Sequence, residues 1–295
     1  MKENLMAKKK FGDRKDARRV PVTALMQCAI DLKPGRLEND VYINRKIDVT
    51  ALREYMEKKN AGGERYTYFH AFVTAIGKVI YNRPKLNRFV ANRHLYEHNE
   101  VTVSFVAKMA FDDKSEELMM IVPIGPDSTM NDVKGIIDKK LANIRSSRAD
   151  EEKAGAHSAI DILGKLPNII RVPIMGAFKA MDKRGWLPSA LTGDLIYYSS
   201  TIISNMGSIG CGAIYHNLAN FGTASSLITM GEIVSENVLG DDGTWQKRYF
   251  CEFGITLDER IRDGYYYAKS AKYIEYLMAH PELLDEPAGE KIEIK

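Results

Sequence analysis

Two reactive side chains lie near one another in the second half of the sequence, and each suggests a different chemistry. His216, within residues 213–217, carries the group best suited to proton transfer near neutral pH. The alternative is that His216 is a surface or core histidine that hydrogen-bonds to a backbone group. Cys211 could accept an acyl group as a nucleophile, but no base is adjacent to it in the sequence. We therefore interpret Cys211 as a packed thiol and keep His216 as a candidate base.

Three further segments place polar residues where apolar runs end. Leu257–Gly264 has the pattern of a strand that passes through a tight turn into a helix. Ile202–Gly207 places Ser204 near the end of an apolar run. The third segment runs from Asn220 to Gly231.

In this order, the segments resemble the dihydrolipoyl acyltransferase cores of 2-oxoacid dehydrogenase complexes. Leu257–Gly264 is similar to their Asp-His-Arg-x-x-Asp-Gly loop, and residues 220–231 are also similar to chloramphenicol acetyltransferase. The resemblance covers about residues 40–285. It implies an α/β fold, a two-layer sandwich with a mixed β-sheet, assembled as a homotrimer with each active site at a subunit boundary.

The resemblance also implies the site residues. Coenzyme A, as an acyl thioester substrate, and the acyl acceptor would enter a channel from opposite ends. Ser204 would donate a hydrogen bond to the tetrahedral oxyanion. Asp263 would fix the loop by pairing with an arginine, and Gly264 would supply the tight turn.

The sequence departs from the family at the general base, where Glu259 replaces histidine. A thiol has a pKa of about 8.5, so proton transfer is uphill by roughly 2.7 kcal/mol to histidine and roughly 5.7 kcal/mol to glutamate. Burial in an apolar channel raises the pKa of a carboxyl group and recovers part of this difference. Two interpretations stay open: Glu259 is the base, or it is a residual loop residue in an ion pair with Arg260 or Arg262.

Two functions follow from these alternatives. The first is a CoA-dependent acyltransferase without a lipoyl module, which would act on a separate lipoyl-type partner or on an unrelated small acceptor. The second is a non-catalytic trimeric scaffold or ligand-binding protein that kept the fold and lost the base.

The elements that would position the site follow from apolar periodicity and capping residues. Thr67 can cap a helix with a strong apolar face, which Pro84 would end. Asp241-Asp242-Gly243 is a hairpin signal between the last two strands. The predicted strands are residues 40–47, 101–109, 118–124, 196–203, 225–230 and 248–257, and the last helix is 265–279.

The domain organisation predicted is one acyltransferase-like domain, residues 39–285, between a basic leader and lead-in segment, 1–38, and a polar tail, 286–295. The first 20 residues carry a net charge of +5 and the rest −2, so a loosely ordered basic tail is expected and no nucleic-acid surface. Prolines interrupt an apolar insertion at 162–190. This pattern suggests that residues 162–190 form a broken helix packed on the body of the domain. Alternatively, they form a segment that binds a membrane surface or a partner.

Other classes of function are disfavoured. The three cysteines form no CxxC pair, so we expect neither a metal site nor a disulfide framework. No apolar run is long enough to span a bilayer, and the N-terminus lacks a signal-peptide pattern. A cytoplasmic location is the expectation.

Overall fold

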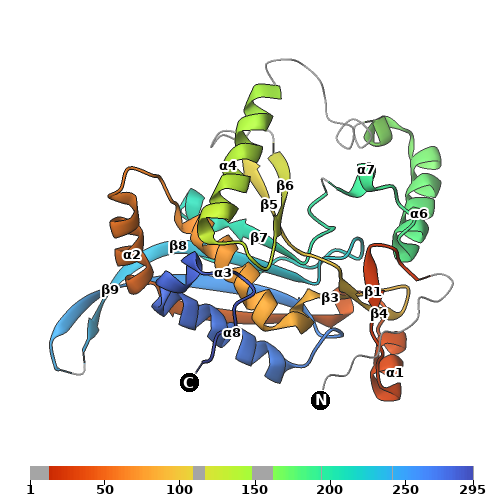
Figure 1. Ribbon diagram of the computed structural model, residues 1–295. Coiled ribbons are helices and arrows are strands. Elements are labelled where there is room, and N and C mark those ends of the chain that lie inside the picture. The colour runs from red at the N-terminus through yellow and green to blue at the C-terminus, as the bar shows by residue number, and fades with distance from the viewer. Residues whose placement is uncertain (1–12, 109–116, 148–161, 194, 241, 295) are drawn as a thin grey trace.

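A layer of helices lies against one face of a large, twisted β-sheet in the computed structural model (Figure 1). The structure describes residues 13–108, 117–147, 162–193, 195–240 and 242–294. This mixed α/β architecture is the two-layer fold that the sequence predicted.

Nine strands form two sheets within the described ranges. They are β1 (Ala17–Arg19), β2 (Asp40–Asp48), β3 (Arg88–Ala91), β4 (His94–His98), β5 (Val101–Lys108), β6 (Glu117–Ile124), β7 (Thr201–Asn205), β8 (Ser226–Leu239) and β9 (Trp245–Asp258). The main sheet has the order β2-β9-β8-β7-β5-β6, and a small antiparallel sheet has the order β1-β4-β3. Strand β7 runs parallel to both β8 and β5, whereas the other pairs are antiparallel.

The helices of the described residues are α1 (Ala24–Leu32), α2 (Thr50–Asn60), α3 (Tyr68–Asn82), α4 (Met130–Ser147), α6 (Asn168–Arg184), α7 (Ser189–Thr192) and α8 (Gly264–Ala279). Residues of α2, α3, α4 and α8 share one core with the main sheet. Helix α3 begins where predicted, because the Thr67 hydroxyl accepts from the backbone N–H of His70, and it ends before Pro84. Each helix described is too short or too polar to cross a membrane.

A buried lysine on α3 ties the C-terminal segment to the body. Lys78 is fully buried, and its Nζ donates to the carbonyl oxygens of Leu283 at 2.7 Å, Glu286 at 3.2 Å and Pro287 at 3.1 Å. Burial lowers the pKa of this ammonium group. The three carbonyls stabilise its charge in place of water.

Two sequence expectations need correction. The loosely ordered leader does not extend to residues 13–20, because β1 pairs with β4 and Arg14 is buried; residues 1–12 lie outside the described residues. The broken helix expected over residues 162–190 is interrupted at Pro167 and Pro188, but not at Pro173, where α6 is continuous. Pro173 has no N–H to donate to the carbonyl of Ile169 four residues earlier. Because Ile169 is 83% exposed, water can donate a hydrogen bond to this carbonyl instead.

Candidate active site

Ser204 lies at the end of β7, on the face of the sheet away from the helices. Its neighbour Ile203 is buried in the helix-covered core, and successive side chains of a strand point to opposite faces. The Ser204 hydroxyl is partly exposed, and its contact in the structure is with the sulfur of Met206 at 3.7 Å. Because thioether sulfur is a weak acceptor, this hydroxyl remains available to a stronger one.

The chain after β7 crosses this same face at close range, and glycines make the approach possible. A Cβ at Gly254 would lie 2.5 Å from the carbonyl oxygen of Ile214, and one at Gly231 would lie 2.7 Å from the nitrogen of Ala213. The Thr229 hydroxyl also donates to the Ile214 carbonyl. Residues 211–214 are therefore held directly on β8 and β9.

The crossing segment then reaches β2 and carries His216 with it. The Tyr42 hydroxyl donates to Asn217 Oδ1 at 2.9 Å, and the backbone N–H of Leu218 donates to Asp40 Oδ2 at 3.2 Å. His216, immediately before Asn217, is exposed. Burial raises the pKa of the Asp40 carboxyl, and the Leu218 hydrogen bond partly offsets this effect.

Glu259 follows β9 and attaches to the residue just before β2. Its backbone N–H donates to the carbonyl of Asn39 at 2.9 Å, while its side chain is exposed. The ion pair considered for Glu259 is not found within the described ranges, because Arg260 binds Asp258 instead. Glu259 and the segment that carries His216 are thus fastened to consecutive residues, Asn39 and Asp40.

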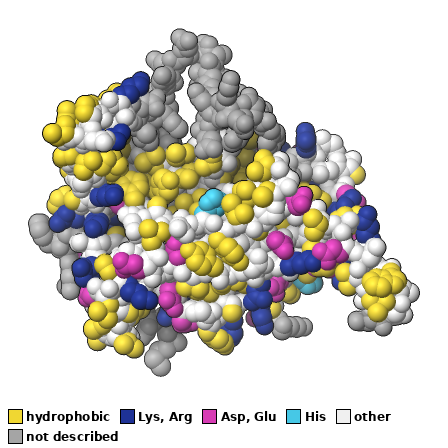
Figure 2. Space-filling model, turned by 180° about the vertical axis from the view of Figure 1, so that it is seen from behind, with side chains coloured by type: hydrophobic (Ala, Val, Ile, Leu, Met, Phe, Trp, Pro, Cys, Tyr) yellow, Lys and Arg dark blue, Asp and Glu magenta, His cyan; other side chains and the backbone are white. Residues whose placement is uncertain are grey.

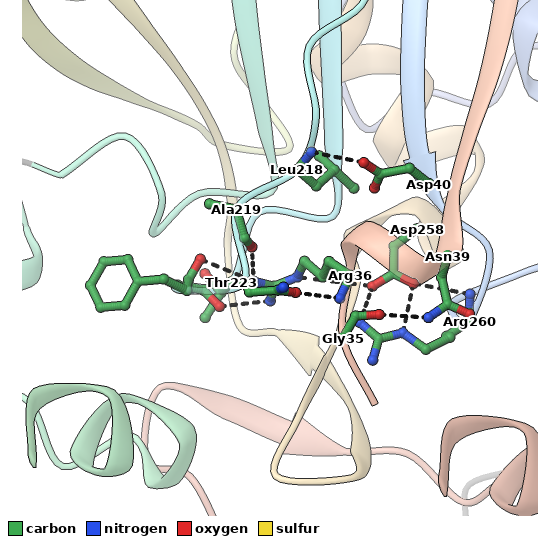
Figure 3. Close-up of polar contacts among 12 residues, drawn as sticks. Gly35, Arg36, Asn39, Asp40, Leu218, Ala219, Thr223, Asp258 and Arg260 are labelled. Atoms are coloured by element: carbon green, nitrogen blue, oxygen red, sulfur yellow. Dashed lines mark hydrogen bonds and ion pairs between the residues drawn. The ribbon is translucent and has the colours of Figure 1, made fainter. Parts of the chain in front are cut away.

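A buried ion network holds this turn in place (Figure 3). Arg260 Nη2 donates to Asp258 Oδ2 at 2.7 Å and its Nε to Oδ1 at 2.9 Å. Arg36 Nε lies 3.9 Å from the same Oδ2. Asp258 is fully buried, and Arg36 and Arg260 are 4% and 6% exposed. Because the charges are removed from water, each depends on the others.

Arg36 extends the network to the far end of the crossing segment. Its Nη1 donates to the carbonyls of Ala219 and Phe221, at 2.9 and 3.0 Å, and its Nη2 donates to Gly222 at 2.6 Å. Burial lowers the pKa of this guanidinium, and Asp258 opposes the change. One pair of charges therefore positions both the Glu259 turn and the segment after His216.

Asp263 has a different task from the one implied by the resemblance. Its carboxylate caps α8 by accepting from the backbone N–H of Tyr266 at 2.9 Å, and this bond lowers its pKa. The acid that pairs with arginines at this loop, in the part of the chain that is described, is Asp258. Neither Asp258 nor Arg36 was predicted from the sequence; the visible signal for Asp258 was an acid at the end of an apolar strand.

Ser204 and Glu259 do not meet within one chain. Ser204 pairs with Thr229, which pairs with Gly254. Five residues of strand from Gly254 to Glu259 span about 17 Å and two strand spacings about 10 Å, so roughly 20 Å separates Ser204 from Glu259.

Cys211 is partly buried, and its backbone is hydrogen-bonded to the backbone of Met206 and of Glu232.

The apolar cavity between α3, α8 and the sheet encloses about 40 Å³, far below the size of coenzyme A. Within the described ranges, no group of three histidine, cysteine or acidic side chains is arranged to hold a metal ion.

No protein-family model and no curated protein matches the sequence. Solved structures are similar in fold: the cubic core of the pyruvate dehydrogenase multienzyme complex is 18% identical, with a TM-score of 0.53 over 90% of this chain and 93% of that chain. Azotobacter vinelandii dihydrolipoamide acetyltransferase is 17% identical, with a TM-score of 0.52 over 90% and 93%. A chloramphenicol acetyltransferase is 10% identical, with a TM-score of 0.51 over 89% and 99%. The chain therefore has the fold of these acyltransferase cores, as the sequence predicted.

Proposed function

We propose that this protein is a CoA-dependent acyltransferase whose active site is completed by a second copy of the chain, in a cytoplasmic homotrimer. The main support for this proposal is the position of two groups that suit acyl transfer. The Ser204 hydroxyl and the Glu259 carboxylate are both accessible, both lack a strong side-chain partner among the described residues, and lie roughly 20 Å apart in one subunit. A symmetric assembly can bring such groups together across a contact.

The reaction needs one base and one oxyanion donor. The base takes the proton from an acceptor thiol or hydroxyl, whose sulfur or oxygen attacks the thioester carbonyl. Ser204 donates a hydrogen bond to the resulting oxyanion. The carbon–sulfur bond to coenzyme A then breaks, and the proton passes to the departing thiolate. The products are the acylated acceptor and free coenzyme A.

Two residues are candidates for the base, and both lie beside the start of β2. Glu259 occupies the motif position, and His216 is exposed two residues before Leu218. The Azotobacter vinelandii enzyme was described with catalytic roles for a serine, a histidine and an asparagine four residues after that histidine. Glu259 and Asp263 have the same spacing here, which supports Glu259 as the residue at the base position.

A thiol-release assay with acetyl-CoA tests the proposal, using dihydrolipoamide and a panel of small thiols and alcohols as acceptors. Ser204→Ala should lower kcat by about 100-fold or more, as removal of an oxyanion donor does elsewhere. Glu259→Gln and His216→Gln, measured separately, identify the base. Failure of every acceptor with the folded protein would contradict the enzymatic proposal.

Mixed assemblies test the shared site. Ser204→Ala and Glu259→Gln subunits, dissociated and reassembled together, should regain activity because some boundaries then combine two intact residues. The matched control is the double variant mixed with itself, which should stay inactive. If the single variants never complement, the site does not lie between subunits.

The alternative is a non-catalytic trimeric scaffold or ligand-binding protein. It is favoured by one observation: Glu259, a poorer base for a thiol than histidine, is exposed in the chain. A stable trimer that binds acetyl-CoA without turnover would support it.

A further inference from the structure

Helix α6 carries a continuous apolar face that the protein leaves uncovered. Ile169 is 83% exposed and Val172 is 65% exposed. Pro173, Gly176, Ala177 and Ala180 are also exposed. Their spacing of three and four residues places these six residues on one side of the helix. Hydrophobic side chains, drawn in yellow, gather over α6 at the upper left of Figure 2.

The body holds α6 by its C-terminal half. Asp182 is buried, and its carboxylate accepts from the Tyr198 hydroxyl at 2.7 Å and from the backbone N–H of Gly222 at 3.1 Å. Phe178 stacks on Phe221 at 5.3 Å. Figure 1 shows the helix standing at the side of the molecule, clear of the main sheet. The helix is therefore firmly oriented, with the uncovered face outward.

The charges around this face have one sign. Between residues 162 and 193 the basic residues are Lys165, Arg171, Lys179, Lys183 and Arg184, and the sole acid is the buried Asp182. None of the five forms an ion pair with an acid in the part of the chain that the structure describes. Trp186, 61% exposed, lies beside Arg184 at the end of the helix.

We propose that α6 docks this protein on the surface of an anionic phospholipid bilayer. Apolar side chains would enter the boundary between headgroups and acyl chains, basic side chains would meet anionic headgroups, and the indole would lie between them. With four basic residues in 17, the helix lies in the surface and does not span it.

Charge complementarity favours lipid over the same helix of a second copy of this chain. Packing of α6 on the α6 of another copy would bring basic side chains together, and like charges repel. At the end of α6, Arg14 donates to the carbonyl of Asp182 at 2.5 Å and is paired with Asp16, so it leaves the basic charge of the helix unbalanced by any acid of its own.

Vesicle co-sedimentation of the full chain tests the proposal. Vesicles of phosphatidylcholine with phosphatidylglycerol should bind the protein, phosphatidylcholine alone should bind it at least tenfold more weakly, and added salt should release it. Ile169→Glu with Val172→Glu, and separately Lys179→Glu with Lys183→Glu, should each lower binding at least tenfold. All four sites are exposed, so folding should persist, and circular dichroism checks this.

The matched control is a second exposed apolar pair. Leu239→Glu with Trp245→Glu at the β8–β9 hairpin, 57% and 72% exposed, should leave vesicle binding unchanged. Equal loss in the control and α6 variants, or no binding of the unaltered protein, would overturn the proposal. If light scattering shows instead that the Ile169→Glu, Val172→Glu variant changes oligomeric mass without vesicle binding, α6 is a contact between copies.

Discussion

Arg36 and Asp258, 222 positions apart in the sequence, face each other in the interior, with Arg36 Nε 3.9 Å from Asp258 Oδ2. Their contact joins the turn that carries Glu259 to the segment that passes over the sheet. The geometry of the candidate site therefore depends on a pair of charges that lie behind it.

Asp258→Asn should destabilise the fold strongly. The amide removes the negative charge between two buried guanidinium groups, and breaking a buried ion pair costs about 3–5 kcal/mol. Urea unfolding at neutral pH measures the loss. The matched control is Glu236→Gln, which breaks an exposed pair with Lys46 and should cost less than about 1 kcal/mol. Equal losses in the two variants would contradict the role of the network.

His98 should make stability fall on acidification. Burial lowers the pKa of His98 to about 4. The unfolded chain binds this proton below about pH 6.5 and the folded protein only near pH 4, so stability is lost as pH falls through this window. The loss attributable to His98 should reach roughly 3 kcal/mol.

Urea unfolding from pH 7 to pH 4 isolates this effect by comparison with His98→Gln. Contributions of other groups cancel in the difference, so the unaltered protein should lose more stability than the variant. His280→Gln, at the exposed end of α8, is the control and should follow the unaltered protein. Parallel curves for His98→Gln and the unaltered protein would show that the histidine titrates normally.

Gly254→Ala should displace the segment that crosses the sheet. The new methyl group would lie 2.5 Å from the Ile214 carbonyl oxygen, and overpacking of this kind costs about 1–3 kcal/mol. Thermal unfolding and the acyl-transfer assay should both report the change. Gly212→Ala is the control in the same segment, because no atom lies within 4 Å of its added methyl group. If both variants behave alike, close contact with β9 is not what fixes the segment.

Glu259→His should raise any basal acyl transfer to a thiol. Histidine is closer to a thiol in pKa than glutamate is by about 2 units, which corresponds to a gain of up to about 100-fold. Initial rates of coenzyme A release give the measurement, with Glu259→Gln as the variant that lacks a base. A correctly folded Glu259→His protein without any gain would mean that this position does not reach the reacting thiol.

Local signals in the sequence predicted the strands of the main sheet and the helices packed on it, but not α1 or the small sheet β1-β4-β3. The Thr67 cap and Pro84 set the ends of α3 because both act within a few residues. Strand β7 is shorter than predicted, beginning at Thr201. The preceding Ser199 and Ser200 are turned inward, where their hydroxyls bond to Ile196 and Thr102. These distant bonds leave no local pattern.

The candidate site was harder to predict from the sequence, because it also depends on contacts between distant residues. The motif located Ser204 and Glu259, yet only the strand registers reveal that they are far apart in one chain. Asp263 carries the acid of the motif, but the buried partner of the arginines is Asp258. Asp258 is buried because residues 33–39 fold against the turn. A fold of this kind between distant segments cannot be predicted from the composition of the turn.

The lysine beneath the C-terminal segment sets a limit on how the chain can be shortened. Lys78 depends on carbonyls from residues 283–287 to stabilise its charge. Removing the chain from Pro281 onward would leave an ammonium group inside an apolar core, whereas a tag joined after Lys295 spares every one of these bonds. Any shortening from this side must therefore leave residues 283–287 in place.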